Sequence, residues 1–515
     1  MASPRARTDA PLWFARLPDA RVVAGRPGAV TAVCYDSRRV VAGALFVAVP
    51  GFETDGHRFL EDAIGRGASA FLVQADHKPL WEPLSDAKDV AVVAVADTRV
   101  ALAQVAAAFH GEPARKLGVI GVTGTDGKTT TVHLTAHLLE CAGRQAGFMS
   151  SVAFRSDGEA ALNKTHMTTL ESPEIQERLA RMADAGRRYA VLEASSHGLA
   201  LHRLDECAFD IAVFTTLSSD HLDFHGTQEE YRAAKGRIFQ MLDESEAKEG
   251  VAKAAVLNAD DAASDYFRTL TRARILSYGI DAPADVRAEA IAHDGLSTRF
   301  RLVTPEGTAE VATGLAGRYN VSNCLAAAAA VLSQGVGLDE IARGLASFPG
   351  VPARLEVIDG GQPFRVVVDF ASTPQALRRV LETLRPVTAG RLIVVFGCAG
   401  ERDPGRRDGM GRAAGELADF AVLTNEDPRR EDPDAIIDAI AAALRQAGRE
   451  EGRDFARVPD RREAIRRAFE YAEAGDTVLL AGKGTEPSIV MGAEHVPWDE
   501  RAVARELLAE VGKKA

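Results

Sequence analysis

The sequence has few cysteines, and their spacing excludes several kinds of site. Five cysteines are spread over 515 residues, at positions 34, 141, 207, 324 and 398. No pair has the spacing of a zinc finger or a redox motif, so we predict neither. An odd, scattered set is typical of reduced thiols in a cytoplasmic protein, which is the location we expect.

Long apolar runs and an excess of positive charge are also absent. No window approaches the roughly 18 apolar residues that a membrane-spanning helix needs. Residues 1–21 carry charges and lack the apolar stretch of a signal peptide. The formal net charge is −12, whereas nucleic-acid-binding proteins usually carry a basic surface. We expect no membrane insertion and no nucleic-acid partner, and a monomer that acts on small molecules.

Length and patterning predict an α/β protein of three domains. At roughly 150 residues per domain the chain has room for about three. Short apolar strands between Gly-rich turns run to residue 112, and strands alternate with helices over residues 113–348 and again over 349–515. Such alternation predicts mostly parallel sheets covered by helices. The third region is Rossmann-like but lacks the G-x-G-x-x-G fingerprint of a dinucleotide site.

The expected elements follow from apolar runs and turn residues. Expected strands are residues 44–49, 70–73, 90–95, 116–122, 189–193, 211–215, 254–257, 365–369, 392–396, 420–424 and 477–481. Expected helices include residues 99–110, 173–185, 228–242 and the alanine-rich run 324–332.

A glycine-rich segment between an apolar strand and a helix carries the sharpest chemical signal. It reads Gly124-Thr125-Asp126-Gly127-Lys128-Thr129-Thr130. Glycines let backbone N–H groups close around phosphates, Lys128 adds positive charge, and Thr129 can hold Mg²⁺. Val122 stands where the usual motif has glycine, and the plain alternative is a turn between strand and helix. The strand–Gly-Lys-Thr-Thr–helix context favours a loop for the phosphates of ATP.

Two polar clusters follow predicted strands. Glu193 and Ser195 come after one strand, and Asp220 and His221 come after the next. Ligands of α/β sheets bind at such carboxyl ends. Glu193 and His221 offer an oxygen and a nitrogen to a divalent cation, although each alone is equally explained as a capping or hydrogen-bonding residue. The nearby phosphate loop favours a metal site. Lys235, by contrast, lies on a predicted helix, and its position alone predicts a solvated side chain.

These segments resemble the Mur ligase family over almost the whole chain. The phosphate loop is similar to that family's Thr-Gly-Thr-Asn-Gly-Lys-Thr, with Asp126 for Asn. Asp36-Ser37-Arg38 and residues 51–57 resemble its uridine-nucleotide domain, and residues 317–323 and Arg354 also fall in family order. Residues 209–239 are most similar to members that add a diamino acid to UDP-N-acetylmuramoyl-L-alanyl-D-glutamate.

The resemblance implies an ATP- and Mg²⁺-dependent ligase of cytoplasmic peptidoglycan precursor synthesis. Its domains would be a small α/β uridine-nucleotide domain (1–112), a central phosphate-loop ATPase domain with a mostly parallel sheet (113–348), and a C-terminal Rossmann-like amino-acid-binding domain (349–515). Its substrates would be the UDP-muramoyl dipeptide and a diamino acid. The dipeptide's carboxylate would attack the γ-phosphate of ATP, and the resulting acyl-phosphate would meet the amine.

The resemblance also implies roles for individual residues. The expected catalytic residues are Lys128, Glu193, His221, Lys235 and Arg354. The expected metal ligands are Thr129, Glu193, His221 and a carbamylated Lys235, whose modification turns a cation into an anion. The expected ATP contacts are Gly124, Thr125, Asp126, Gly127, Lys128, Thr129, Thr130, Asn258, Asn320, Arg354 and Asp369. The expected contacts of the uridine nucleotide and its dipeptide are Ser37, Phe52, Glu53, Thr54, Thr168, Thr169, Ser195 and Arg203. The expected amine contacts are Arg402, Glu426, Asp427, Pro428, Arg429, Gly482 and Glu486.

Three motifs depart from the family pattern and leave the amine open. Ser372 replaces a common His, Glu426-Asp427-Pro428-Arg429 replaces the Asp-Asn-Pro-Arg of diaminopimelate-adding members, and Gly482-Lys483-Gly484-Thr485-Glu486 replaces Gly-Lys-Gly-His-Glu. Asp427 is an acceptor-only anion and favours an ammonium, whereas Arg429 and Arg402 suit a distal carboxylate. We favour meso-diaminopimelate, with L-ornithine and L-lysine as alternatives.

Two other functions compete with this interpretation. The first is a polyglutamate or cyanophycin-type ligase, against which the uridine-like first domain argues. The second is a non-catalytic or regulatory ATP-binding homologue. The retained Lys128, Glu193, His221 and Lys235 argue against that second alternative.

Overall fold

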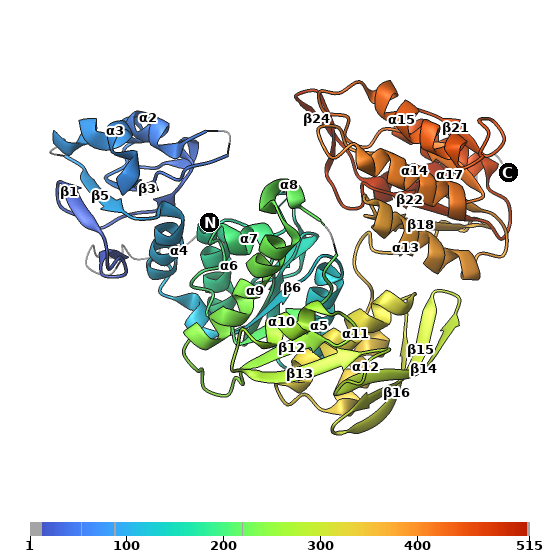
Figure 1. Cartoon of the computed structure of the whole chain (residues 1–515), viewed down its shortest axis with the longest axis horizontal. Helices are drawn as coiled ribbons and strands as arrows, with labels where there is room; N and C mark the ends of the chain where they lie inside the picture. Colours follow the sequence, from blue (N-terminus) through green and yellow to red (C-terminus); the bar gives the residue numbers. More distant parts are fainter. Residues whose placement is uncertain (1–12, 53, 87–88, 166, 219, 512–515) are drawn as a thin grey trace. The chain divides into compact units, whose positions relative to one another are not determined.

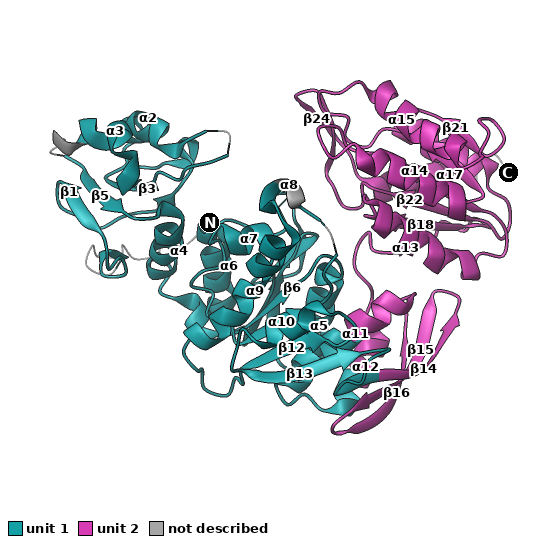
Figure 2. Cartoon of the chain, viewed as in Figure 1, with its two compact units in different colours: residues 1–287, 325–341 teal, residues 288–324, 342–515 magenta. Residues whose placement is uncertain are grey.

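The computed structural model describes residues 13–52, 54–86, 89–165, 167–218 and 220–511. The chain forms two compact units, one of residues 1–287 with 325–341 and one of residues 288–324 with 342–515 (Figures 1 and 2). The three-domain division remains a prediction from the sequence, because the boundary between the units runs through one strand and two helices. No helix in the described part of the chain is long and apolar enough to cross a membrane.

The first unit begins with a five-stranded sheet in the order β1-β5-β4-β3-β2, in which β1 alone is antiparallel. Its strands are β1 (Arg21–Ala24), β2 (Val33–Cys34), β3 (Leu45–Val47), β4 (Ala70–Gln74) and β5 (Ala91–Val95). Its helices include α2 (Leu60–Gly65), α3 (Lys78–Trp81) and α4 (Thr98–Phe109). Successive strand residues join two different apolar clusters, Phe46 and Phe71 on one face and Leu45 and Leu72 on the other. Both faces of the sheet are therefore covered.

The first unit continues with parallel strands in the order β13-β12-β11-β6-β10-β7, and β8 and β9 extend the β7 edge antiparallel. The strands are β6 (Gly118–Thr123), β7 (Ala146–Met149), β8 (Ala153–Arg155), β9 (Ala161–Leu162), β10 (Tyr189–Glu193), β11 (Ile211–Phe214), β12 (Ala254–Asn258) and β13 (Arg274–Gly279). The helices are α5 (Lys128–Cys141), α6 (Ser172–Asp184), α7 (Ser196–Ala200), α8 (Leu222–His225), α9 (Gln228–Glu244) and α10 (Ala263–Arg268). The carboxyl ends of β6, β10, β11 and β12 therefore meet at one edge.

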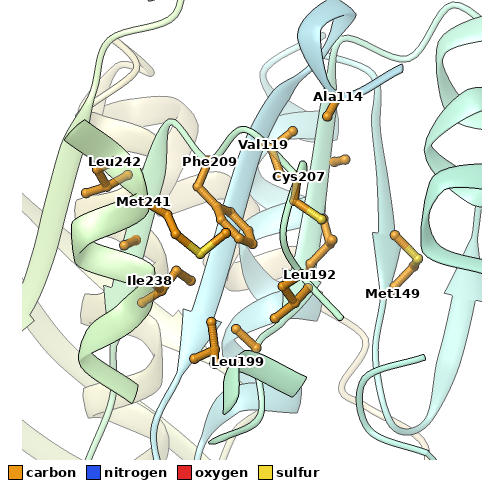
Figure 3. Close-up of a cluster of buried hydrophobic side chains, with 14 of the residues drawn as sticks. Ala114, Val119, Met149, Leu192, Leu199, Cys207, Phe209, Ile238, Met241 and Leu242 are labelled. Carbon is orange, nitrogen blue, oxygen red and sulfur yellow. The ribbon is translucent and has the colours of Figure 1, made fainter. Parts of the chain in front are cut away.

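Close packing fixes α9 against the central strand. Figure 3 shows Ile238 and Met241 beside Phe209, within one buried apolar cluster. A Cβ added to Gly121 of β6 would lie 2.4 Å from Ile238 Cδ1, so the helix approaches only because this position is glycine. This packing sets which side of α9 faces the end of β6.

The second unit contains a six-stranded sheet in the order β17-β18-β22-β19-β20-β21, parallel except for β17. Its strands are β17 (Glu356–Ile358), β18 (Arg365–Asp369), β19 (Leu392–Phe396), β20 (Phe420–Leu423), β21 (Phe455–Arg457) and β22 (Thr477–Ala481). Its helices include α13 (Pro374–Leu384), α14 (Gly405–Leu417), α15 (Pro433–Gln446), α16 (Arg461–Tyr471) and α17 (Glu500–Val511). Apolar clusters again cover both faces.

Antiparallel strands also occur, and the sequence analysis did not predict them. The strands β15 (Ser297–Thr304) and β16 (Gly307–Thr313) pair as a hairpin, as do β23 (Ser488–Met491) and β24 (Glu494–Pro497). Three elements span the boundary between the units, namely β14 (Val286–Asp294), α11 (Arg318–Leu332) and α12 (Leu338–Ser347).

Candidate active site

The predicted phosphate loop joins β6 to α5, and its carbonyl oxygens accept hydrogen bonds from its own lysine. Lys128 Nζ donates to the carbonyl oxygens of Gly124 at 3.0 Å and Thr125 at 2.9 Å. Gly124 has a φ of 146°, and a Cβ there would lie 1.9 Å from Thr215 Oγ1, so no side chain fits. The loop ends at the N-terminus of a 14-residue helix, where N–H groups and the helix dipole favour phosphate. This geometry suits a triphosphate.

An oxygen-rich cluster lies at the carboxyl end of β10. Glu193 ends this strand and is 2% exposed. Its Oε1 accepts from Ser151 N at 2.9 Å and from Ser151 Oγ at 3.2 Å, and Ser151 Oγ lies 3.0 Å from Thr129 Oγ1. Ser151 therefore links two predicted magnesium ligands. The sequence analysis missed it, because a serine after a short strand carries no signal by itself.

Lys235, on α9, is buried, and the sequence-based prediction of a solvated side chain is wrong. It is 1% exposed, and its Nζ donates to Gly124 O at 2.8 Å. Burial first, and then the charge of Lys128, hold the pKa of Lys235 well below its usual value. The ring of Tyr231 lies 4.4 Å from Nζ, and its hydroxyl is 3.0 Å from Thr125 Oγ1. Tyr231, also missed from sequence, thus connects α9 to the phosphate loop.

His221 lies in an aromatic cluster that follows β11. Its ring centroid is 4.8 Å from that of His197 and 6.3 Å from that of Tyr231, and its Nε2 is 3.4 Å from Asp220 Oδ2. The backbone of His221 is left-handed, with a φ of 53°, a conformation that is uncommon outside glycine and often found at functional sites. The structure thus brings His221 beside the helix that carries Lys235. Ser219, which precedes this segment, lies outside the described residues.

One group of three potential metal ligands exists in the described part of the chain, and it lies elsewhere. It consists of Asp55, His57 and His77 in the N-terminal region. His57 Nε2 accepts the N–H of Gln74 at 2.9 Å, so the ring proton is on Nδ1, which donates to Asp55 Oδ1 at 2.6 Å. Because both ring nitrogens are used, we interpret this group as a hydrogen-bonded network.

Two predicted ATP contacts use their side chains within the chain. Asn258 Nδ2 donates to Thr215 O at 2.7 Å, and its Oδ1 accepts from Asp260 N at 3.0 Å. In the second unit, Asn320 Nδ2 donates to Ala316 O at 2.7 Å. These asparagines shape the local backbone, and their contact with ATP stays a prediction.

Arg354 and Asp369 lie near each other in the second unit. The neighbours of Arg354, Ala353 and Leu355, have φ values of 53° and 51°, and Arg354 Nε is buried without a hydrogen-bond partner. Asp369 Oδ2 accepts from Leu355 N at 2.7 Å. Burial raises the pKa of Asp369, and Arg354 opposes that rise. An unpartnered buried donor on a strained segment is typical of a ligand-facing side chain.

Three predicted dipeptide contacts meet beside Glu193. Thr169 Oγ1 donates to Glu193 O at 2.9 Å, and Ser195 Oγ donates to Thr169 Oγ1 at 2.9 Å. Arg203 Nη1 donates to Thr169 O at 3.2 Å, Arg203 Nη2 pairs with Glu171 Oε1 at 2.7 Å, and Arg203 Nε is buried without a hydrogen-bond partner. Thr168 is half-buried next to this group. Hydroxyls and a guanidinium beside the metal-ligand candidate suit a carboxylate-bearing substrate.

The predicted uridine contacts lie on short loops of the N-terminal region. Ser37 is buried at the start of a 3-10 helix, and Thr54 is exposed. Phe52 is 73% exposed, and its ring contacts Phe224 edge-on, with centroids 5.6 Å apart. Glu53 lies outside the described residues. Phe52 is thus the large exposed apolar side chain of this set.

The predicted amine contacts lie at the carboxyl edge of the second unit's sheet. Asp427 Oδ1 accepts from Lys483 Nζ at 2.8 Å and from Val490 N at 2.8 Å, and Lys483 Nζ donates to Glu486 Oε2 at 2.5 Å. Lys483 is 0% exposed. The structure therefore joins Asp427 and Glu486 through Lys483, which the sequence analysis quoted within a motif but assigned no role.

The rest of the predicted amine set includes a third arginine whose Nε is buried without a hydrogen-bond partner. Arg429 has a φ of 54°, and its Nε is buried without a hydrogen-bond partner. Glu426 is buried, which raises its pKa to about 8, and a Cβ on Gly482 would lie 2.7 Å from Glu426 Oε2. The carbonyl of Pro428 lies 2.1 Å from where a Cβ of Gly400 would be. Arg402 is exposed.

The buried side chain of Arg461 holds the backbone next to the predicted amine contacts. Arg461 donates to Asn425 O at 3.2 Å and to Ala481 O at 2.8 Å, the carbonyls just before the two amine-contact segments. Arg461 also pairs with Glu500 at 2.6 Å, and Trp498 Nε1 donates to Glu500 Oε2 at 2.6 Å. The sequence analysis missed these residues, since pairs distant in sequence leave no local pattern.

Comparisons with known proteins cover nearly the whole chain. Family models match residues 29–110 (Mur ligase family, catalytic domain), 122–331 (Mur ligase middle domain) and 353–484 (Mur ligase, glutamate ligase domain). The chain is 46% identical over 492 residues to the UDP-N-acetylmuramyl-tripeptide synthetase of Roseiflexus sp. (strain RS-1), covering 94% of this chain and 95% of that protein. It is 43% identical over 484 residues to the UDP-N-acetylmuramoyl-L-alanyl-D-glutamate--2,6-diaminopimelate ligase of Geobacillus kaustophilus (strain HTA426), covering 94% and 96%.

A solved structure agrees with these matches. The structure of a UDP-N-acetylmuramoyl-L-alanyl-D-glutamate--2,6-diaminopimelate ligase is 32% identical and superimposes with a TM-score of 0.64, covering 94% of this chain and 96% of that chain. The resemblance inferred from the motifs and the α/β fold class is thereby confirmed, and the chain belongs to the Mur ligase family.

Proposed function

We propose that this chain joins a diamino acid to the D-glutamate of UDP-N-acetylmuramoyl-L-alanyl-D-glutamate, with meso-diaminopimelate as the favoured amine. As a Mur ligase the chain is an ATP-dependent ligase that acts on small molecules. The observation that carries the proposal is the meeting of the phosphate loop, Glu193 and buried Lys235 at one sheet edge. The names of the relatives support the choice of nucleotide substrate.

The oxygen donors at this edge fit Mg²⁺. Glu193 is a buried carboxylate whose Oε1 hydrogen bonds come from Ser151, and Thr129 adds a hydroxyl on the same serine. Oxygen ligands are those that Mg²⁺ prefers. Thr129, Glu193 and His221 would hold the metal, which when bound would neutralise charge on the phosphates.

Lys235 suits carbamylation. A lysine is carbamylated through its neutral amine, and burial of Lys235 together with the nearby Lys128 favours that form. The carbamate would place an anion able to join the metal site where the unmodified amine is neutral. Lys235 Nζ, which would carry the carbamate, donates to Gly124 O of the phosphate loop.

The chemistry follows from the positions of these side chains. Thr169, Ser195 and Arg203 would hold the dipeptide, so that its glutamyl side-chain carboxylate attacks the γ-phosphate of ATP and ADP leaves. Lys128 would offset the charge that develops during phosphoryl transfer. The acyl-phosphate so formed is attacked by the α-amine of the diamino acid, and phosphate leaves.

The contacts of Arg429 favour a dicarboxylic amine. Ornithine or lysine would be favoured if Arg429 paired with Asp427 or Glu426. In the described part of the chain, Asp427 pairs with Lys483 instead, and Arg429 Nε has no partner. A guanidinium without a counter-ion suits a distal carboxylate, as in diaminopimelate.

One assay separates these functions. We expect ATP hydrolysis that requires both the UDP-dipeptide and a diamino acid, with the UDP-tripeptide as product by mass spectrometry. Turnover with folate or peptide polyglutamates instead would support the polyglutamate alternative. ATP binding without product would support a non-catalytic homologue. The monomeric state and the cytoplasmic location remain predictions.

A further inference from the structure

A buried lysine links the two carboxylates of the proposed amine site. Lys483 is fully buried, and its Nζ contacts Asp427 Oδ1 at 2.8 Å and Glu486 Oε2 at 2.5 Å. Buried charges are stable only when they are paired and hydrogen-bonded. These contacts therefore fix the positions of all three side chains.

Asp427 is also bonded to the β23–β24 hairpin, and this contact positions Arg429. Asp427 Oδ1 accepts from Val490 N at 2.8 Å, while Arg429 N donates to Val490 O at 2.9 Å. Gly492 N donates to Arg429 O at 2.6 Å. The turn that carries Arg429 is thereby held on the hairpin in its left-handed conformation. Lys483 acts on Arg429 through Asp427.

Two opposite charges remain at this site after the internal pairing. Asp427 and Glu486 share the one cation of Lys483, which leaves one net negative charge. Arg429 adds one positive charge, and its Nε is buried without a hydrogen-bond partner. A ligand end with both an ammonium and a carboxylate matches both charges, whereas a lone ammonium matches the first alone.

The other ionisable groups packed around this site do not change the balance. Burial raises the pKa of Glu426 to about 8, so this carboxyl is mostly protonated near neutral pH. Arg461 is paired with Glu500 at 2.6 Å. Apart from the exposed Arg402, the charge facing a ligand is thus set by Asp427, Glu486, Lys483 and Arg429.

We propose that Lys483 is a specificity-determining positioning residue. Its charge balances one carboxylate, and its hydrogen bond holds Asp427 in place. The site therefore selects an amine whose far end is an α-amino acid over one whose far end is a lone ammonium. The inference rests on the proposed function. It explains why Asp427, an anion where similar ligases carry asparagine, does not turn the site toward ornithine or lysine.

The test is the ratio of kcat/KM for meso-diaminopimelate to kcat/KM for L-lysine. In Lys483→Met, Asp427 and Glu486 lose their cation, and Arg429 is drawn toward Asp427. We expect the ratio to fall at least about tenfold, through a higher KM for diaminopimelate with little change in kcat. Adding Asp427→Asn to the same chain removes the surplus anion and should return the ratio to within about threefold of wild type.

A matched control distinguishes specificity from general damage. Lys248 is a half-buried lysine, paired with Asp210 at 2.7 Å, but it lies in the first unit. Lys248→Met should lower thermal stability and leave the ratio unchanged. If Lys483→Met does not fold, Asp427→Asn alone serves as the test. Its amide keeps an acceptor for Val490 N, and the surplus cation should raise the ratio.

Several outcomes would overturn the inference. A ratio within about twofold of wild type in folded Lys483→Met or Asp427→Asn would do so, as would a double variant that does not recover the ratio. A wild-type chain that ligates neither amine would instead overturn the proposed function. The two failures are therefore distinguishable.

Discussion

Two buried lysines, one in each unit, have opposite surroundings. Lys235 is 1% exposed and Lys483 is 0% exposed. The Nζ of Lys235 contacts a carbonyl oxygen and an aromatic face, whereas that of Lys483 contacts two carboxylates. Desolvation without a counter-ion favours the neutral amine, and ion pairing favours the cation. Burial alone therefore assigns no role to a lysine, and its partners decide whether it is suited to modification or to charge balance.

The largest expected effect is the loss of activity on replacing Lys235, and rescue by added carboxylates should distinguish Lys235 from Lys483. Lys235→Ala should lower kcat by on the order of a thousandfold, because the anion proposed for the metal site is lost. Added formate or acetate should restore part of the activity by supplying that anion. The same carboxylates should not rescue Lys483→Ala, which lacks a cation. An unmodified Lys235, by mass, in an active preparation supplied with bicarbonate would contradict carbamylation.

A second expected effect concerns the guanidinium that Lys483 helps to position. Arg429→Ala should lower kcat/KM for meso-diaminopimelate. The loss should correspond to the roughly 2–5 kcal/mol that removing one partner of a desolvated charge pair costs. It should not improve ornithine or lysine, since neither has a distal carboxylate. Steady-state kinetics with the three amines measure this. A wild-type preference above about tenfold for ornithine or lysine would reverse our choice of amine and leave the ligase assignment standing.

A smaller effect is expected at the cluster of oxygen donors formed by Thr129, Ser151 and Glu193 in the first unit. Ser151→Ala removes the hydroxyl between Thr129 and Glu193, so the affinity for a divalent cation should fall by about 10–100-fold. Mn²⁺ titration followed by electron paramagnetic resonance, with a non-hydrolysable ATP analogue, measures it without turnover. Ser150→Ala is the matched control, because Ser150 Oγ bonds to Ala153 instead. Equal Mn²⁺ affinity in the two variants would remove Ser151 from the metal site.

The smallest expected effect is on stability and lies beside Lys483. The folded state raises the pKa of Glu426 from 4.5 to about 8, so between these values the native state keeps a proton that the unfolded chain has lost. The free energy of unfolding should therefore fall as pH rises through this window, by at most about 1.4 kcal/mol per pH unit. Glu426→Gln should remove that slope. Urea unfolding at pH 6 and pH 8 measures it, and equal slopes in both proteins would contradict the burial argument.

The parallel strands were predictable because each is a short, continuous apolar run. The strand at residues 189–193 matches β10, and the one at 365–369 matches β18. The antiparallel strands escaped notice because their signal is weaker. In β15, buried and exposed residues alternate, so no apolar run marks the strand. The sequence analysis therefore predicted the buried parallel strands and missed the antiparallel strands, which are partly exposed.

In the candidate site, too, features with a local sequence pattern could be proposed, and those that depend on residues distant in sequence could not. The phosphate loop could be proposed because its spacing is local, and Thr169 and Ser195 because the family resemblance named them, and the roles of all three stay predictions. The environment of Lys235 was not predictable from its own helix, since α9 approaches β6 through a glycine, Gly121, over a hundred residues earlier. The role of Lys483 was hidden for the same reason: Asp427 is 56 residues away in sequence.

The last helix matters for handling the protein. Glu500 begins α17 and, with Trp498, holds Arg461, whose guanidinium binds the carbonyls of Asn425 and Ala481. Proteolysis or trimming from residue 498 onward would leave Arg461 buried without its counter-ion, and both strand ends at the amine site would lose their support. A tag fused after α17 keeps these contacts. Shortening the chain from residue 498 would therefore weaken the proposed amine site, although none of the predicted site residues is removed.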